Sequence, residues 1–185
     1  WDDLPYPMYN RTYYESDDML LGISKQTVNL VKNVLKDKPK EDWAVNYVPH
    51  GIDPKKFYPI KGGTEELALK GFKEKYLGEE EFDFVMLWNS RNIRRKNMSD
   101  IVLAWRTFLD QLPVEQAKKC CLLMKTEISS EHGTDLNAVV KTFCDPKIHK
   151  VKFVTDRLDD KGMNYLYNCS DAHIFMTDNE GWGLG

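Results

Sequence analysis

The sequence predicts an α/β fold built on a Rossmann-like parallel sheet with helices on both faces. Three observations predict it. Short runs of residues that are apolar throughout alternate with segments whose apolar residues recur at helical spacing. Continuous apolar runs are typical of strands buried on both faces, and parallel neighbours need a helical crossover between them. Finally, 42% of the 185 residues are hydrophobic, which is enough for a core and excludes a disordered chain.

The first 60 residues predict a small strand–helix–strand unit followed by a linker. The apolar run over residues 19–23 predicts a strand, and Ser24 is a typical N-cap for the helix behind it. The apolar positions of that helix are Val28, Val31 and Leu35. Residues 45–48 predict a second strand. Pro and Gly are frequent in residues 49–54, so we expect an extended linker there.

The rest of the chain predicts repeated strand–helix units. Thr64 is a candidate cap for a helix that Gly78 ends. The predicted strands beyond it are residues 84–88, 120–124, 151–154 and 172–176. The predicted helices between them start near residue 99 and cover residues 136–143 and 163–167, the last opened by Asp159 and Asp160. This order predicts four parallel strands in one sheet.

Composition excludes several classes of partner. The formal net charge is −3, so no global basic field attracts nucleic acid, and the basic run at residues 94–96 has no aromatic stacking platform beside it. No apolar run approaches the roughly 20 residues that cross a bilayer, so we expect no transmembrane segment. The four cysteines fit neither a disulfide framework nor a zinc knuckle, which favours reduced thiols and a cytoplasmic location.

Polar loops follow each strand of the predicted sheet. They are residues 89–97, 125–127, 155–157 and 177–185. Because ligands of open α/β sheets bind beyond the carboxyl ends of the strands, we expect all four loops at one ligand-binding edge. Cations beside glycines suit a phosphate-bearing ligand. Each loop taken alone could also be an ordinary solvent-exposed polar loop. Their shared position at one edge of the sheet favours a ligand-binding site.

Two other kinds of site are less consistent with the pattern. Gly181, Gly183 and Gly185 match part of a G-x-G-x-x-G dinucleotide loop, but that motif belongs after the first strand of its unit. The four histidines show no metal-ligand spacing, and no D-x-D motif occurs. We therefore expect no metal and no cofactor.

Four segments in order resemble a known family. They are residues 20–25 (LLGISK), residues 47–59 (YVPHGIDPKKFYP), Arg91 with Lys96 five positions later, and residues 166–184. Together they resemble the retaining, nucleotide-sugar-dependent glycosyltransferases of the group 1 (family 4) type, which have the two-Rossmann-domain GT-B fold. The resemblance implies a partial GT-B fold, with residues 1–60 as the tail of the acceptor domain and the linker. Residues 61–185 would be a donor-binding domain truncated at its C-terminus.

The sequence also departs from the family pattern. Ser90 and Asn97 stand where the family usually has Gly, Trp182 replaces Phe, and Gly185 stands where Pro is common. None of these departures removes a charged group. The family's paired glutamates are spaced E-x7-E, which would place the partner of Glu180 three positions beyond Gly185.

The resemblance implies a role for individual residues. Arg91 and Lys96 would grip the donor diphosphate and stabilise the charge that grows as the glycosidic bond breaks, and Glu180 would orient the sugar. The donor-binding residues would be Ser90, Thr126, Val154, Thr155, Gly181, Gly183 and Leu184. The nucleotide-sugar donor is then a substrate, and the two cations take the place of a metal.

The expected function is transfer of a sugar from a nucleotide-diphosphate sugar to an acceptor hydroxyl with retention of configuration. The acceptor, whether glycan, lipid or small molecule, is unknown, and we expect the fragment itself to be inactive. Two alternatives are a catalytically silent sugar-nucleotide-binding or interaction domain and a GT-B nucleotide-sugar epimerase.

Overall fold

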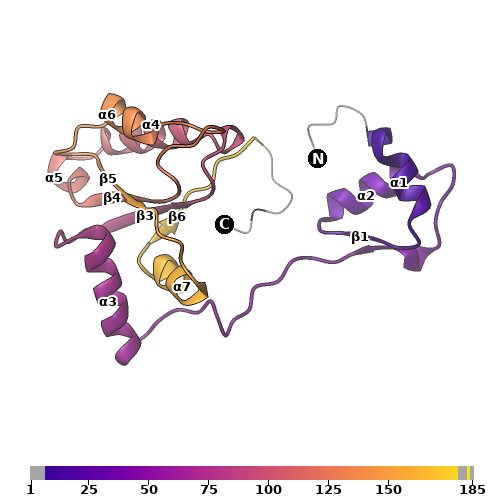
Figure 1. Cartoon of the computed structure of the whole chain (residues 1–185), viewed down its shortest axis with the longest axis horizontal. Coiled ribbons are helices and arrows are strands. Elements are labelled where there is room, and N and C mark those ends of the chain that lie inside the picture. Colours follow the sequence, from indigo (N-terminus) through magenta and orange to yellow (C-terminus); the bar gives the residue numbers. More distant parts are fainter. Residues whose placement is uncertain (1–6, 179–182, 184–185) are drawn as a thin grey trace. The chain divides into compact units, whose positions relative to one another are not determined.

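A computed structural model describes residues 7–178 and 183 of the chain (Figure 1). Contacts divide the described chain into two units, a smaller one with residues 7–52 and 183 and a larger one with residues 53–178. Residues 53–60, which we expected in the linker, thus group with the larger unit. No helix within the described residues is long and apolar enough to cross a membrane.

The smaller unit is a strand–helix–strand arrangement. Its elements are η1 (Pro7–Asn10), α1 (Arg11–Ser16), β1 (Leu20–Gly22), α2 (Lys25–Val34), η2 (Asp42–Ala44) and β2 (Val45–Tyr47). The two strands pair in parallel, with Leu20 opposite Val45. Ser24 caps α2 as predicted, because its side chain accepts a hydrogen bond from the backbone N–H of Thr27 at 3.0 Å. The buried face of α2 packs on Val45.

The larger unit contains a four-stranded parallel sheet. Its elements are α3 (Thr64–Leu77), β3 (Phe84–Asn89), η3 (Arg94–Lys96), α4 (Met98–Leu109), α5 (Val114–Ala117), β4 (Cys120–Lys125), α6 (Leu136–Phe143), β5 (Lys150–Val154), α7 (Asp160–Asn168) and β6 (Ala172–His173). The strand order is β5-β4-β3-β6, and every pair is parallel. The α/β prediction is confirmed.

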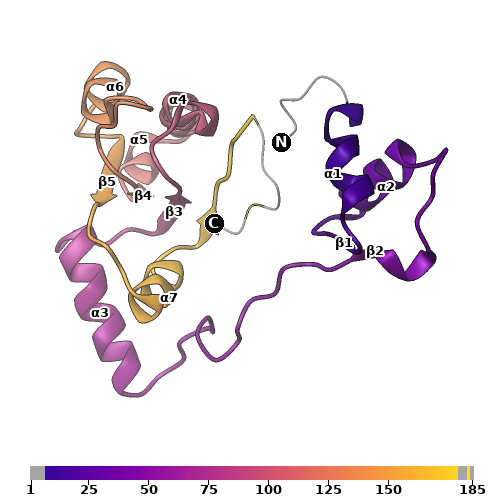
Figure 2. The same ribbon diagram turned by 45° about the vertical axis from the view of Figure 1, so that its right-hand side comes forward.

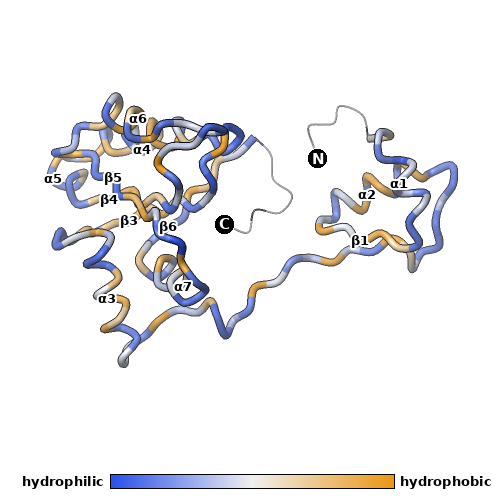
Figure 3. Tube along the Cα trace, in the orientation of Figure 1, coloured by the Kyte–Doolittle hydropathy of each residue, from blue (hydrophilic) through white to orange (hydrophobic). Residues whose placement is uncertain are grey.

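Helices cover both faces of this sheet, as the apolar strands predict. Trp88 and Met124 lie opposite each other in the register and face α4 and α6, whereas Leu87 and Leu123 face α3 and α7. All four side chains are fully buried. Figure 2 shows the two helical layers with the sheet between them, and Figure 3 shows hydrophobic residues along its strands. The two layers hold the carboxyl ends of the strands at one edge.

The structure corrects some element boundaries. The last strand covers only Ala172–His173, because the chain beyond it turns toward the loop that follows β3. Thr64 is the first residue of α3 and not its cap, a position that Gly63 occupies with a φ of 76°. The short helix α5 has no counterpart among the predicted elements.

Candidate functional site

The strand order places a topological switch point between β3 and β6. From β3 the chain crosses to β4 and β5 on one side of the sheet, and it later returns to add β6 on the other side. Loops that leave neighbouring strands in opposite directions open a crevice at their carboxyl ends, which is where open α/β sheets bind ligands. The sequence places its most cationic loop, residues 89–97, after β3.

The loops after β3 and β6 meet at this edge. The backbone N–H of Asp178 and the hydroxyl of Thr177 both donate to the carbonyl of Arg95, at 2.9 and 3.0 Å. The side-chain amide of Asn97 donates to the Asp178 carboxylate at 2.6 Å. Asn97 adopts a left-handed conformation with a φ of 46°, a region in which Asn is several-fold enriched among non-glycine residues. The expectation that these two loops share one edge is met.

Lys96 is a buried cation at this meeting point. Lys96 is only 6% exposed, and its ammonium lies 4.8 Å from the centre of the Phe175 ring. Burial, with a smaller contribution from the neighbouring Arg95, lowers the pKa of Lys96. An ammonium in such a low-dielectric place interacts more strongly with an anion than an exposed lysine does.

Arg91 lies in the same loop, and its side chain is exposed. Within the described part of the chain its guanidinium has no hydrogen bond and no ion pair. An arginine presents five donors in a planar fork that matches phosphate oxygens. Arg91 is therefore available to an external anion.

Three further predicted residues lie at the ends of β4 and β5. The backbone N–H of Thr126 donates to the carbonyl of Val154 at 3.3 Å, which ties the two strand ends together. Val154 is fully buried in the core beneath α3 and α7, whereas Thr155 is exposed. The hydroxyl of Thr126 is buried without a hydrogen-bond partner among the described residues.

The remaining predicted residues belong to the loop after β6. Glu180, Gly181 and Leu184 lie outside the described residues, so their proximity to Arg91 and Lys96 stays a prediction. Gly183 is described and has a φ of 77°, a conformation that favours glycine. Ser90, between β3 and Arg91, is half-buried, and its backbone N–H donates to the Lys125 carbonyl at 3.3 Å.

Sequence reasoning missed two residues of this edge. Phe175 supplies the ring under Lys96, although it follows a strand that we expected to continue past it. Asn92 is 1% exposed and bonds to the loop that follows β4. An asparagine in a polar loop has no spacing that distinguishes it from its neighbours, so only the tertiary structure shows its burial.

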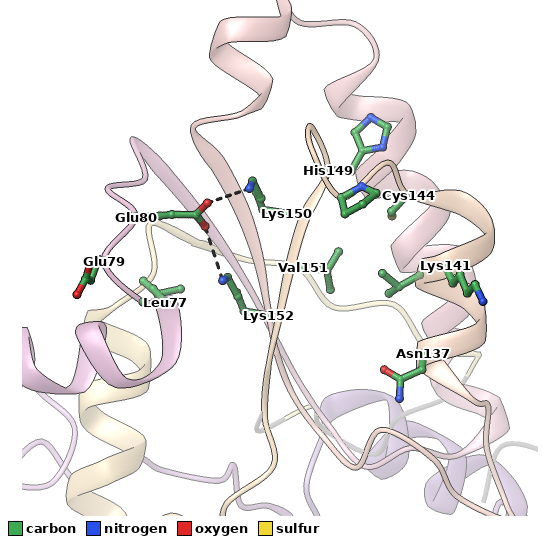
Figure 4. A pocket seen from close by; sticks show the side chains of 13 residues that line it. Leu77, Glu79, Glu80, Asn137, Lys141, Cys144, His149, Lys150, Val151 and Lys152 are labelled. Atoms are coloured by element: carbon green, nitrogen blue, oxygen red, sulfur yellow. Dashed lines mark hydrogen bonds and ion pairs between the residues drawn. The ribbon is translucent and has the colours of Figure 1, made fainter.

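A separate groove of about 720 Å³ runs along the outer side of β5 (Figure 4). Its walls include Val140 and Cys144 on the α6 side and Leu77 at the end of α3. Lys150 and Lys152 reach the same carboxylate, that of Glu80, at 2.9 and 3.6 Å. None of the residues that line this groove was predicted as part of the site.

Comparisons with known proteins show the fold. No protein-family model and no curated protein matches the chain. A sucrose-phosphate synthase from Thermosynechococcus elongatus is similar in structure, with a TM-score of 0.64 and 19% identity over 96% of this chain and 39% of that one. The E. coli trehalose-6-phosphate structure with bound UDP-2-fluoro glucose gives a TM-score of 0.63 at 13% identity, covering 97% and 44%.

A glycosyltransferase from Rickettsia africae is also similar, with a TM-score of 0.59 and 22% identity over 91% of this chain and 41% of that one. These structures are GT-B glycosyltransferases. The chain spans about two-fifths of the length of the structures it matches. The predicted GT-B type of α/β fold is thus confirmed for that span.

Proposed function

We propose that this chain is the donor-binding part of a retaining glycosyltransferase of the family 4 type, which moves a hexose from a nucleotide-diphosphate sugar to an acceptor hydroxyl. One observation carries the proposal: the loops after β3 and β6 meet at the switch point, and the loop after β3 carries both the buried Lys96 and Arg91, whose guanidinium has no partner among the described residues. The GT-B fold of the similar structures supports it.

In this proposal Arg91 and Lys96 bind the diphosphate of the donor. As the bond from the sugar to the diphosphate breaks, negative charge accumulates on the leaving phosphate. A guanidinium fork and a buried ammonium stabilise that charge, and groups aimed at developing charge are worth about 10²–10³ in rate. Two such cations supply the positive charge that a metal supplies elsewhere, so we propose a metal-independent reaction.

The neighbouring residues complete the donor site. We propose that Thr126 and Thr155 lie beside the nucleoside, where the hydroxyl of Thr126, which has no hydrogen-bond partner within the described part of the chain, supports a polar contact. Glu180 would orient the sugar hydroxyls, and the backbone amides of Gly183 and Leu184 would meet phosphate or sugar oxygens. The acceptor and its binding residues are assigned to parts of the enzyme other than this chain, so the chain by itself should bind donor without turnover.

The test is a calorimetric titration of the folded chain with UDP, GDP and ADP. UDP comes first because the similar E. coli structure holds a UDP sugar. Charge-assisted hydrogen bonds contribute roughly 1.5–3 kcal/mol, so Arg91→Ala should weaken nucleotide binding by about 10- to 100-fold. Lys150→Ala, in the groove beside β5, is the control and should bind as the wild type does. Equal affinities of wild type and Arg91→Ala would refute this site.

Product analysis tests the reaction itself. The intact enzyme, incubated with labelled donor and candidate acceptors, should yield a glycoside with the anomeric configuration of the donor. An isomerised donor sugar would indicate an epimerase, and an unchanged donor despite tight binding would indicate a silent binding domain. Either result would contradict the proposed transfer.

A further inference from the structure

Asn92 forms a buried connection between the loop after β3 and the loop after β4. Its side-chain amide donates to the carbonyls of Glu127 and Thr134 at 2.9 and 2.7 Å. Its side-chain oxygen accepts from the backbone N–H of Thr134 at 2.8 Å. The residue is 1% exposed. Both N–H groups and the oxygen of one amide are therefore used to join two loops that are far apart in the sequence.

These bonds restrain the backbone on both sides of Arg91. Before it, the N–H of Ser90 donates to the Lys125 carbonyl at 3.3 Å, and after it stands Asn92. A further bond, from the N–H of Arg94 to the His132 carbonyl at 3.0 Å, continues the attachment along the loop. The guanidinium of Arg91 has no partner within the described chain to hold it, so its position depends on this backbone.

Gly133 is the counterpart that makes room for Asn92. A Cβ atom at position 133 would lie 1.9 Å from the Asn92 side-chain oxygen and 2.5 Å from its carbonyl oxygen. The backbone of Gly133 lies outside the left-handed region, so close approach, and not conformation, requires glycine here. The connection thus depends on a small residue in one loop and an amide in the other.

We infer that Asn92 is a positioning residue, which fixes Arg91 where the donor diphosphate binds. The inference rests on the proposed function, because it assigns Asn92 an effect through Arg91 and no contact with the ligand. A charged group that is already in place before its ligand arrives loses little conformational freedom on binding, which raises affinity. Without the amide, the loop after β3 would sample several positions and Arg91 would be correctly placed only part of the time.

The test is a double-mutant cycle of Asn92→Ala and Arg91→Ala, with inorganic pyrophosphate and UDP as probes. In the wild-type background, Asn92→Ala should weaken binding about tenfold. In the Arg91→Ala background the same change should have almost no effect, since the group it positions is gone. A merely structural role would weaken binding equally in both backgrounds, and that result would overturn the inference.

Asn164→Ala is the matched control. Asn164, in α7, is also buried, at 3% exposure, and its side-chain oxygen accepts from the backbone N–H of Tyr58 at 3.1 Å. It should lower the melting temperature as Asn92→Ala does while leaving the affinity for pyrophosphate unchanged. Weaker binding in Asn164→Ala would show that general destabilisation explains the effect, and would overturn the inference.

Asn92→Asp provides a second variant of the same size, in case the alanine protein does not fold. An ionised carboxylate cannot donate to the two carbonyls that the amide reaches, so this variant should also bind pyrophosphate about tenfold more weakly. If Arg91→Ala weakens binding and neither Asn92 variant does, Asn92 has no positioning role and the proposed function stands. If Arg91→Ala itself has no effect, the proposed function fails, and the role of Asn92 fails with it.

Discussion

Two regions of the larger unit contain several basic side chains, and the surroundings of these side chains differ between the two regions. Along the outer side of β5, Lys150 and Lys152 share the carboxylate of Glu80. At the carboxyl edge beside β3, Arg91 has no partner among the described residues, and Lys96 is buried over an aromatic ring. The groove beside β5 offers a hollow of about 720 Å³. The carboxyl edge beside β3 offers the positive charge that a phosphate ligand needs.

The difference is explained by the place of each region in the sheet. β5 is one of the two edge strands of the described sheet, where lysines commonly prevent pairing with another chain. The switch point is where diverging loops leave room for a ligand. A hollow whose two lysines already share a carboxylate partner is therefore weaker evidence for an anion site than an arginine at a switch point that has no partner among the described residues.

Charge reversal should give the largest contrast between the two regions. In Arg91→Glu, repulsion replaces attraction, so the affinity for pyrophosphate should fall by roughly 100-fold or more. Lys152→Glu carries the same change in net charge but lies in the groove, so its affinity should stay within about twofold of the wild type. Calorimetry on both variants measures this contrast. Equal losses would mean that only the overall charge of the protein matters.

The burial of Lys96 predicts an effect of pH on binding. Because its pKa lies below the ordinary 10.5, Lys96 loses its charge earlier than an exposed lysine as the pH rises. Nucleotide affinity should then fall by about tenfold between neutral pH and the ordinary lysine pKa. Over the same range the free protein should gain stability, because the unfolded state binds more protons than the folded state.

The variant Lys96→Arg tests whether the fall in affinity with rising pH comes from deprotonation of Lys96 or from the titration of other groups. Arginine keeps its charge throughout this range, so the variant should show a much smaller fall in affinity. Titrations at several pH values, together with urea unfolding of the ligand-free protein, measure both trends. An identical pH profile for wild type and Lys96→Arg would rule out Lys96 as the titrating group.

Much of the fold could be predicted from the sequence because local signals and burial agree. The helix predicted over residues 136–143 is observed with the same bounds, and Asp159 caps α7 by accepting from the Gly162 N–H at 2.8 Å. The last strand was predicted too long. The assigned strand ends at His173, although the N–H of Ile174 still donates to the Leu87 carbonyl of β3 at 2.9 Å. The ring of Phe175, one residue further on, lies 4.8 Å from the ammonium of Lys96.

The candidate site could be predicted only in part. The rule that parallel strands end at one edge was enough to bring the loops after β3 and β6 together. The connection from Asn92 to the loop after β4 depends on how closely Gly133 approaches it, and a tertiary distance of this kind has no signal in a single sequence. The role of Glu180 remains a prediction, because that residue lies outside the described part of the chain.

The smallest effect is expected in the groove itself. Glu80→Gln removes the carboxylate that Lys150 and Lys152 share, but all three side chains are partly exposed. Ion pairs of this kind contribute about 0–1 kcal/mol, so the free energy of unfolding at neutral pH should fall by less than about 1 kcal/mol. The affinity for pyrophosphate at the carboxyl edge should not change.

The pH dependence of the stability lost in Glu80→Gln shows whether the ion pairs of Glu80 cause that loss. The hydrogen bond from Lys150 is the main cause that lowers the pKa of Glu80. Its stabilising effect is therefore present above the pKa of the unfolded chain and is lost as the pH falls through the lower, folded value. Urea unfolding of wild type and Glu80→Gln should differ at neutral pH and converge in acid. A difference that persists in acid would mean that Glu80 supports the fold by packing, and its ion pairs with the lysines of β5 would then not explain the stabilisation.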